Sequence, residues 1–157
     1  MTTTPTSTRS GLRPEACSER SESKREGLTL LGQKVTGPVR QLETFPNRHP
    51  GRPYTVTLTT EEFTCLCPIT GQPDFARITI RYIPDQKILE SKSLKLYLWS
   101  FRNEGHFHEH VTNLILDDLV QALDPIRCEV IGEFNVRGGI AITVEAKYER
   151  ATPSETP

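Results

Sequence analysis

Alternation of apolar and polar residues predicts two strands in the first half of the chain. The segments 54–60 (Tyr-Thr-Val-Thr-Leu-Thr-Thr) and 75–83 (Phe-Ala-Arg-Ile-Thr-Ile-Arg-Tyr-Ile) repeat with the two-residue period of a strand that buries one face. Between them, residues 68–74 are rich in proline and glycine, which is typical of a turn. We therefore expect Cys67 at a strand end and Asp74 at the start of the next strand.

The middle of the chain changes to the helical period. Apolar residues recur there at spacings of three and four in two stretches, which predicts two helices. Ser91 is the candidate N-cap of the first helix and Gly105 its candidate stop, while Asp124-Pro125 ends the second. His108 and Glu109 fall in the first turn of the second helix. The apolar positions are Leu94, Tyr97, Leu98 and Phe101, then Val111, Leu114, Ile115 and Ala122.

Two further strands are predicted after residue 125, where alternation returns. They join at Arg137-Gly138-Gly139, which is typical of a tight hairpin. The order of two strands, two helices and two strands predicts the α+β class with one antiparallel sheet. The edges of such a sheet carry unpaired backbone groups, so we expect a homo-oligomer. The strand positions are Cys128, Val130, Phe134 and Val136, then Ile140, Ile142, Val144, Ala146 and Tyr148.

The composition of the 157 residues predicts one folded domain between two terminal segments that do not fold. Residues 1–27 hold almost no large apolar side chain, which predicts a disordered N-terminal tail. Residues 28–150 form the predicted domain, and residues 151–157 a flexible C-terminus. The formal net charge of −1 argues against direct binding to nucleic acid. No export signal or membrane-spanning stretch is recognisable, so we expect a cytoplasmic protein that does not contact a membrane.

Cys67 is the first candidate for chemistry, because a thiolate is a strong nucleophile where neighbouring groups lower the pKa of the thiol. In a protein that is not exported, Cys17, Cys65, Cys67 and Cys128 are expected to be free thiols. The turn that follows Cys67 can return the Asp74 carboxyl to the sulfur, where it can exchange a proton. A structural cysteine and a turn-forming aspartate are the alternatives.

The histidines form a second group of candidates. His106, His108 and His110 with the nearby cysteines could form a zinc site, but side chains two residues apart diverge on a helix, so we favour a solvated face. His108 and Glu109 suit an organic ligand better. A carboxylate accepts two N–H donors of a guanine-like ring edge, and histidine transfers protons near neutral pH. Glu109 could equally complement the helix dipole.

The segment Glu90-Ser-Lys-Ser-Leu-Lys-Leu-Tyr97 places Lys92 and Lys95 at a predicted helix start. Charge and backbone N–H groups can hold phosphate oxygens at such a place, although lysines there are commonly only solvated. The chain has no G-x-G-x-x-G motif, so a dinucleotide would bind without a Rossmann turn.

Taken together, three parts of the sequence closely resemble the NADPH-dependent 7-cyano-7-deazaguanine reductases of queuosine biosynthesis, in their short single-module form. These parts are Phe63-Thr-Cys-Leu-Cys67-Pro-Ile-Thr-Gly-Gln-Pro-Asp74-Phe, the segment from Glu90 to Tyr97, and Ser100-Phe-Arg-Asn103 with Phe107-His-Glu109. The resemblance implies the tunnelling fold, with two helices on one face of a four-stranded antiparallel sheet. It also implies pentameric rings stacked as a decamer, with active sites at subunit boundaries.

The resemblance further implies a reaction and a role for each candidate residue. The nitrile of 7-cyano-7-deazaguanine would be reduced to an aminomethyl group with two NADPH and no metal. Cys67 matches the nucleophile that forms a covalent thioimide, and Asp74 the acid–base residue beside it, with His108 also near the reacting group. The implied substrate contacts are Leu89, Glu90, Ser91, His108 and Glu109. The implied NADPH contacts are Lys92, Lys95 and Arg137, the last from a facing subunit.

Two other functions remain open at this point. A zinc-dependent hydrolase of the same fold, similar to a GTP cyclohydrolase, would use cysteine and histidine as metal ligands. A purine-binding or ring-forming protein without catalysis would bind its ligand with no need of the Cys67 thiol. Tightly held zinc would indicate the first, and ligand binding without NADPH consumption the second.

Overall fold

The computed structural model describes residues 28–151, so the predicted N-terminal tail and all but the first residue of the predicted C-terminal segment lie outside the described residues. The domain boundaries stay predictions. In chain order the elements are β1 (Thr44–Pro46), β2 (Val56–Leu66), β3 (Pro73–Ile83), β4 (Lys87–Leu89), α1 (Ser91–Ser100), the 3-10 helix η1 (Phe101–Asn103), α2 (His108–Leu123), β5 (Arg127–Arg137) and β6 (Ile140–Glu149).

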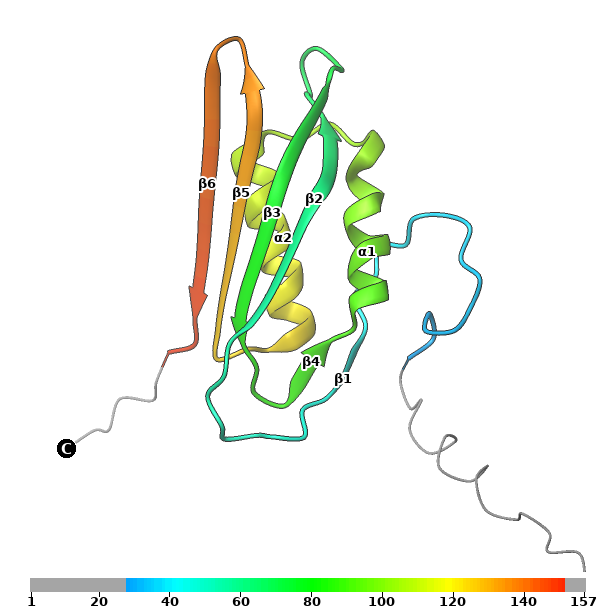
Figure 1. The fold of residues 1–157 in the computed structure, drawn as a ribbon, viewed down its shortest axis with the longest axis vertical. Coiled ribbons are helices and arrows are strands. Elements are labelled where there is room, and N and C mark those ends of the chain that lie inside the picture. Colours follow the sequence, from blue (N-terminus) through cyan, green and yellow to red (C-terminus); the bar gives the residue numbers. More distant parts are fainter. Residues whose placement is uncertain (1–27, 152–157) are drawn as a thin grey trace, which may run out of the picture.

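One antiparallel sheet, in the strand order β2-β3-β5-β6, forms a layer of the domain, with β2 and β6 at its edges. In Figure 1, α2 lies behind this sheet and α1 runs beside β2. Both helices contribute to one apolar core with the inner face of the sheet. The predicted α+β order of two strands, two helices and two strands is confirmed for these main elements.

The core is built from alternate strand residues and one stripe of each helix. Ile78, Ile80 and Val130 point inward from β3 and β5 and are at most 1% exposed. The helix residues that bury against the sheet are Leu94, Tyr97, Leu98, Val111, Ile115, Leu119 and Leu123. The Tyr97 hydroxyl also donates a hydrogen bond to Asp118 of α2 (2.6 Å), so the helices are joined by a polar contact as well as by packing.

The predicted cap of the first helix is wrong by one residue. Glu90, not Ser91, is the N-cap of α1, and its carboxylate accepts hydrogen bonds from the N–H groups of Lys92 (2.8 Å) and Ser93 (2.7 Å). A carboxylate satisfies two free N–H groups and also complements the positive end of the helix dipole, which a serine hydroxyl does less well. The α-helix ends at Ser100 and continues as η1, so Gly105 is not its direct stop.

A short two-stranded sheet was not predicted, because strands of three residues carry too little periodicity to recognise. β1 pairs with β4, with Thr44 opposite Leu89. Next to it, the buried Glu43 carboxylate accepts hydrogen bonds from the N–H groups of Thr29 (2.8 Å) and Leu30 (3.2 Å). The first described residues are thereby tied to the segment that leads into α1.

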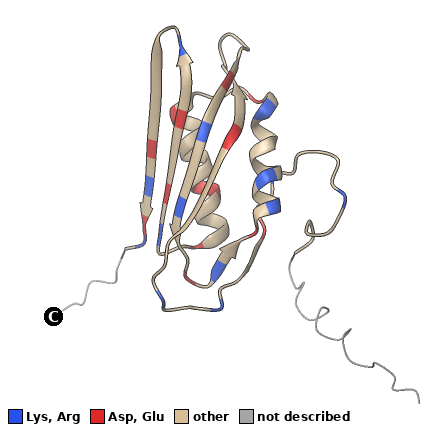
Figure 2. Ribbon diagram, in the orientation of Figure 1, with Lys and Arg blue, Asp and Glu red and all other residues tan. Residues whose placement is uncertain are grey.

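The outer face of the main sheet carries charges of both signs. Figure 2 shows acidic and basic residues alternating over β3, β5 and β6. Lys147 lies 3.2 Å from Glu129, which also faces Arg81 at 3.7 Å. This mixed surface has no basic excess. Within residues 28–151, no helix is both long and apolar enough to cross a membrane.

Close contact between α2 and the sheet predicts a cost for any side chain at Gly132. A Cβ added there would lie 2.8 Å from the Thr112 Oγ1, which is buried and bonded to the His108 carbonyl. Gly132→Ala is expected to lower the free energy of unfolding by about 1–3 kcal/mol, measured by urea denaturation. Gly37→Ala is the control, since its added Cβ meets nothing within 4 Å. Equal effects of the two changes would contradict this packing.

Candidate active site

Three segments that carry candidate catalytic residues lie close together at one end of the sheet. In Figure 1 the β2–β3 turn, the start of α2 and the β5–β6 hairpin all lie at the upper end of the domain. They bring Cys67, Asp74, His108 and Arg137 close together, although these residues span 71 positions of the chain. The predicted placement of Cys67 at a strand end and of Asp74 at the start of the next strand is confirmed, because Cys67 directly follows β2 and Asp74 is the second residue of β3.

Cys67 begins a single tight turn that holds its sulfur in place. The Cys67 N–H donates to the Gln72 carbonyl (2.8 Å), and the Gly71 N–H donates to the Cys67 carbonyl (2.9 Å). Pro68 follows Cys67 as proline does at the first position of a helix, and the N–H groups of Ile69 and Thr70 donate to the sulfur. The Cys67 sulfur therefore accepts hydrogen bonds from the turn that follows it.

This turn makes Cys67 the reactive thiol of the described residues. Hydrogen bonds from the Thr70 hydroxyl and from the N–H groups of Thr70 and Ile69 lower the pKa of Cys67 from 9.0 to about 7, against the opposing effect of burial. Burial instead raises the pKa values of Cys65 and Cys128 to about 11. These three thiols are free, as expected, and Cys17 lies outside the described residues.

Asp74 lies across the hairpin from Cys65 and faces two partners. Its side chain is 6% exposed. One carboxylate oxygen lies 2.7 Å from the Arg137 Nη1, and the other lies 3.3 Å from the His108 Nε2. A buried carboxylate is stable only with such partners, so these contacts fix its position.

The β5–β6 hairpin supplies two parts of the site that the sequence did not assign to it. The Phe134 ring stacks on the His108 ring at 3.9 Å between centroids. A β-bulge between Phe134 and Arg137 turns Arg137 toward Asp74, and Gly138 and Gly139 close the hairpin with positive φ. Arg137, expected to contact NADPH from a facing subunit, is thus bonded to Asp74 within its own chain.

The predicted substrate contacts fall into two places. Glu109 is exposed in the first turn of α2, next to the His108 cluster. Leu89, Glu90 and Ser91 lie instead at the start of α1. β3 and then α1 separate the two places, and the 11 residues of β3 alone span ~35 Å. One chain therefore does not bring all five residues around one small molecule.

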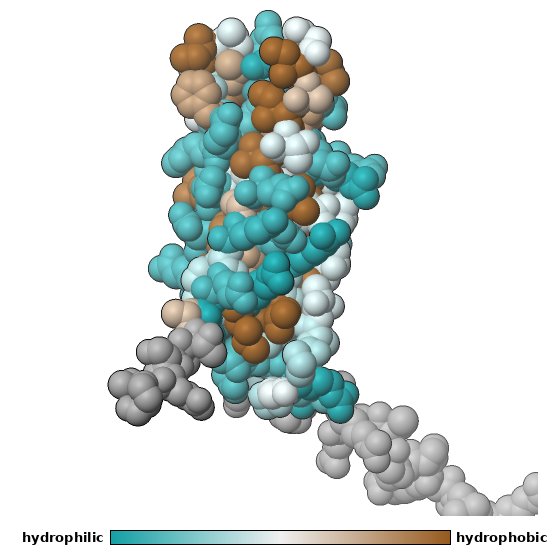
Figure 3. Space-filling model, turned by 90° about the vertical axis from the view of Figure 1, so that its left-hand side faces the viewer, coloured by the Kyte–Doolittle hydropathy of each residue, from teal (hydrophilic) through white to brown (hydrophobic). Residues whose placement is uncertain are grey.

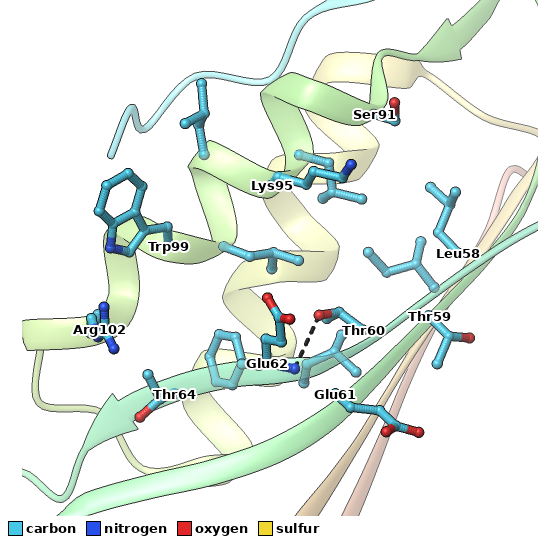
Figure 4. A pocket seen from close by; sticks show the side chains of 16 residues that line it. Leu58, Thr59, Thr60, Glu61, Glu62, Thr64, Ser91, Lys95, Trp99 and Arg102 are labelled. Carbon is cyan, nitrogen blue, oxygen red and sulfur yellow. Dashed lines mark hydrogen bonds between the residues drawn. The ribbon is translucent and has the colours of Figure 1, made fainter. Parts of the chain in front are cut away.

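The two lysines of this helix start differ in their surroundings. The Lys92 ammonium donates to the carbonyl oxygens of Leu30 (2.6 Å) and Gln33 (2.5 Å), so it is already engaged. Lys95 is exposed. Figure 4 shows Ser91 and Lys95 of α1 facing β2 across a groove, whose floor is apolar. The apolar lining residues are Leu58, Phe63, Ile78, Ile80, Leu94, Leu96, Leu98 and Trp99.

An apolar rim surrounds the end of the domain that carries Cys67 and Asp74. Five large side chains of the turn, the strand and helix starts, and the hairpin are exposed there, with Ile69 at 78%. They are Ile69, Phe75, Phe107, Val136 and Ile140. Figure 3 shows apolar surface gathered at this end. Such a cluster is typical of a surface that another molecule covers.

The described part of the chain does not form the metal site of the hydrolase alternative. Within residues 28–151, no group of three or more His, Cys, Asp or Glu side chains could hold a metal ion. The Glu104 carboxylate instead pairs with His106 (3.0 Å) and with Arg40 (2.5 Å). His106 lies beside His110 with 5.8 Å between ring centroids.

Thr70 was missed as a functional residue, and its contact with the sulfur generates a prediction. Thr70→Val removes the hydroxyl that contributes most to lowering the pKa of Cys67, so this pKa should rise from about 7 toward 9.0. The rate of Cys67 alkylation by iodoacetamide, followed on its own peptide by mass spectrometry, should then reach its midpoint at higher pH. Thr57→Val, on the exposed part of β2, is the control. An unchanged midpoint for Thr70→Val would refute the assignment.

Comparison with known proteins identifies relatives of this chain. The protein-family model described as "QueF-like protein" matches residues 73–153. The chain is 68% identical over 123 residues to the NADPH-dependent 7-cyano-7-deazaguanine reductase of Syntrophus aciditrophicus, covering 78% of this chain and 87% of that relative. It is 54% identical over 134 residues to the enzyme of the same name from Bacillus subtilis, covering 82% and 81%.

A solved structure supports the fold. The crystal structure of the archaeosine synthase QueF-Like in the apo form aligns with a TM-score of 0.58 at 24% identity, over 65% of this chain and 99% of that chain. This likeness confirms the fold class, and the sequence relatives decide the family. The chain belongs to the family of NADPH-dependent 7-cyano-7-deazaguanine reductases.

Proposed function

We propose that this chain reduces the nitrile of 7-cyano-7-deazaguanine to the aminomethyl group of 7-aminomethyl-7-deazaguanine, with NADPH as reductant, in queuosine biosynthesis. The observation that carries the proposal is the Cys67 thiol, whose pKa is lowered to about 7 beside the buried Asp74 carboxylate. The names of the relatives supply the substrate and the reductant.

The first step is addition of Cys67 to the nitrile carbon. The sulfur supplies the electron pair of the new C–S bond, one π bond of the nitrile breaks, and the nitrogen takes up the proton that the thiol gives up. The product is a thioimide. A nitrile is a mild electrophile, so the attack needs this proton as charge develops on nitrogen. We assign the relay of this proton to Asp74, whose carboxylate contacts His108 and Arg137.

His108 and Glu109 hold the other parts of the substrate. The Phe134 ring fixes the His108 ring, so that its Nε2 faces Asp74 and can exchange a proton with it. Glu109 lies one residue further, in the exposed part of the first turn, where its carboxylate can accept the N–H donors of the purine edge.

NADPH, when bound, would supply the two hydrides that reduction of the thioimide to the amine requires. The two lysines that could contact its phosphates differ in whether their ammonium groups already have partners. Lys95 is exposed beside the groove and free to meet an anion, whereas Lys92 must first exchange its two carbonyl partners. Lys95 is therefore the principal phosphate contact of the two.

The complete site is shared between subunits. Because Leu89, Glu90 and Ser91 lie far from Cys67 in one chain, they can reach the same substrate only from a neighbour. The free edges β2 and β6 and the apolar rim are surfaces through which copies can join, in pentameric rings stacked as a decamer.

A covalent adduct with the nitrile tests the proposal. Incubation with 7-cyano-7-deazaguanine in the absence of NADPH should raise the intact mass of the chain by the mass of one substrate. Cys67→Ala should abolish this adduct, because no other described thiol has a lowered pKa. Cys128→Ala, at the far end of the sheet, is the matched control and should keep it. An adduct that survives in Cys67→Ala would remove Cys67 from this role.

A further inference from the structure

Arg137 is held in the catalytic cluster by the shape of its hairpin. The β-bulge after Phe134 shifts the register, so that Arg137 pairs with Ile140 across a turn of two glycines. Its Nη1 lies 2.7 Å from one Asp74 oxygen, while His108 takes the other oxygen. Arg137 also lowers the pKa of the Cys67 thiol, although less than the groups of the β2–β3 turn do. The guanidinium thus joins the proposed nucleophile to the proposed proton carrier.

This contact differs from the other arginine pairs of the sheet. Arg77 lies 4.0 Å from Glu133, and both side chains are about half exposed. Such a pair contributes little, because water screens it. Arg137 is 42% exposed but Asp74 is only 6% exposed, so water competes less well at the carboxylate end of this charge-assisted bond.

We propose that Arg137 is a positioning residue for the addition step: it orients the Asp74 carboxylate and the Cys67 sulfur before NADPH takes part. The inference rests on the proposed function. It assigns Arg137 to its own chain's addition chemistry rather than to the phosphates of a cofactor on a facing subunit. As the C–S bond forms, the thiol proton passes through Asp74 to the nitrile nitrogen, and Arg137 stays bonded to the carboxylate throughout.

Adduct formation without NADPH separates the two roles of Arg137. Arg137→Ala should slow adduct formation by about tenfold or more and raise the midpoint pH of Cys67 alkylation, since the cationic donor beside the sulfur is lost. The titratable groups linked to Arg137 in this cluster are Asp74 on β3, which Arg137 contacts, and His108 on α2, which contacts Asp74. Arg137→Lys, which keeps the charge, should restore part of the rate of adduct formation and move the alkylation midpoint part of the way back to the wild-type value. Arg77→Ala should leave both unchanged.

Each outcome decides the assignment. Unchanged adduct formation and alkylation in Arg137→Ala, with only a higher KM for NADPH, would overturn it and make Arg137 a cofactor contact. Equal melting temperatures of Arg137→Ala and the wild type exclude misfolding as the cause of a loss, and Arg137→Lys replaces it if they differ. If the wild-type chain forms no adduct, the proposed function fails, and the alkylation profile alone still shows whether Arg137 acts on Cys67.

Discussion

Burial of the Asp74 carboxylate is the constraint that organises this end of the molecule. A carboxylate removed from water needs partners, and its two oxygens face His108 of α2 and Arg137 of β5. The start of the second helix and the tip of the last hairpin are therefore both fixed against the β2–β3 turn. The same turn aims two backbone N–H groups at the Cys67 sulfur. One hairpin thus lowers the pKa of the thiol and positions the carboxylate that we propose as its proton relay.

In our proposal, the residues that react and some of the residues that bind the substrate lie at different places in the chain. The reactive cluster lies at one end of the sheet, and the segment from Leu89 to Ser91 begins α1 near the other end. Glu90 and Lys92 are engaged there in capping and in binding the first described residues, which makes that segment rigid. A rigid segment can present its exposed Ser91 to a neighbouring chain. Assembly then becomes a requirement of the reaction in our proposal.

The sequence allowed the main elements to be predicted, because their periodicity reflects burial on one face. Two local features were not predicted from the sequence. Glu90 rather than Ser91 caps α1, and β1 and β4 are too short to show a periodic pattern. Thr70 could have been found, since proline after Cys67 is typical of a helical turn whose N–H groups face the preceding side chain. The Arg137–Asp74 contact could not, because it depends on a bulge that shifts the register by tertiary packing.

Activity of mixed assemblies tests most directly whether Cys67 and Ser91 of different subunits form one nitrile-reducing site. Cys67→Ala and Ser91→Trp should each be inactive alone in NADPH oxidation driven by 7-cyano-7-deazaguanine. When co-assembled, they should regain part of the activity, because some boundaries then join an intact Cys67 end to an intact Ser91. Cys67→Ala mixed with Asp74→Asn, both altered at the same end, should regain none. Full activity of Ser91→Trp alone, or no recovery in co-assembled rings, would contradict the shared site.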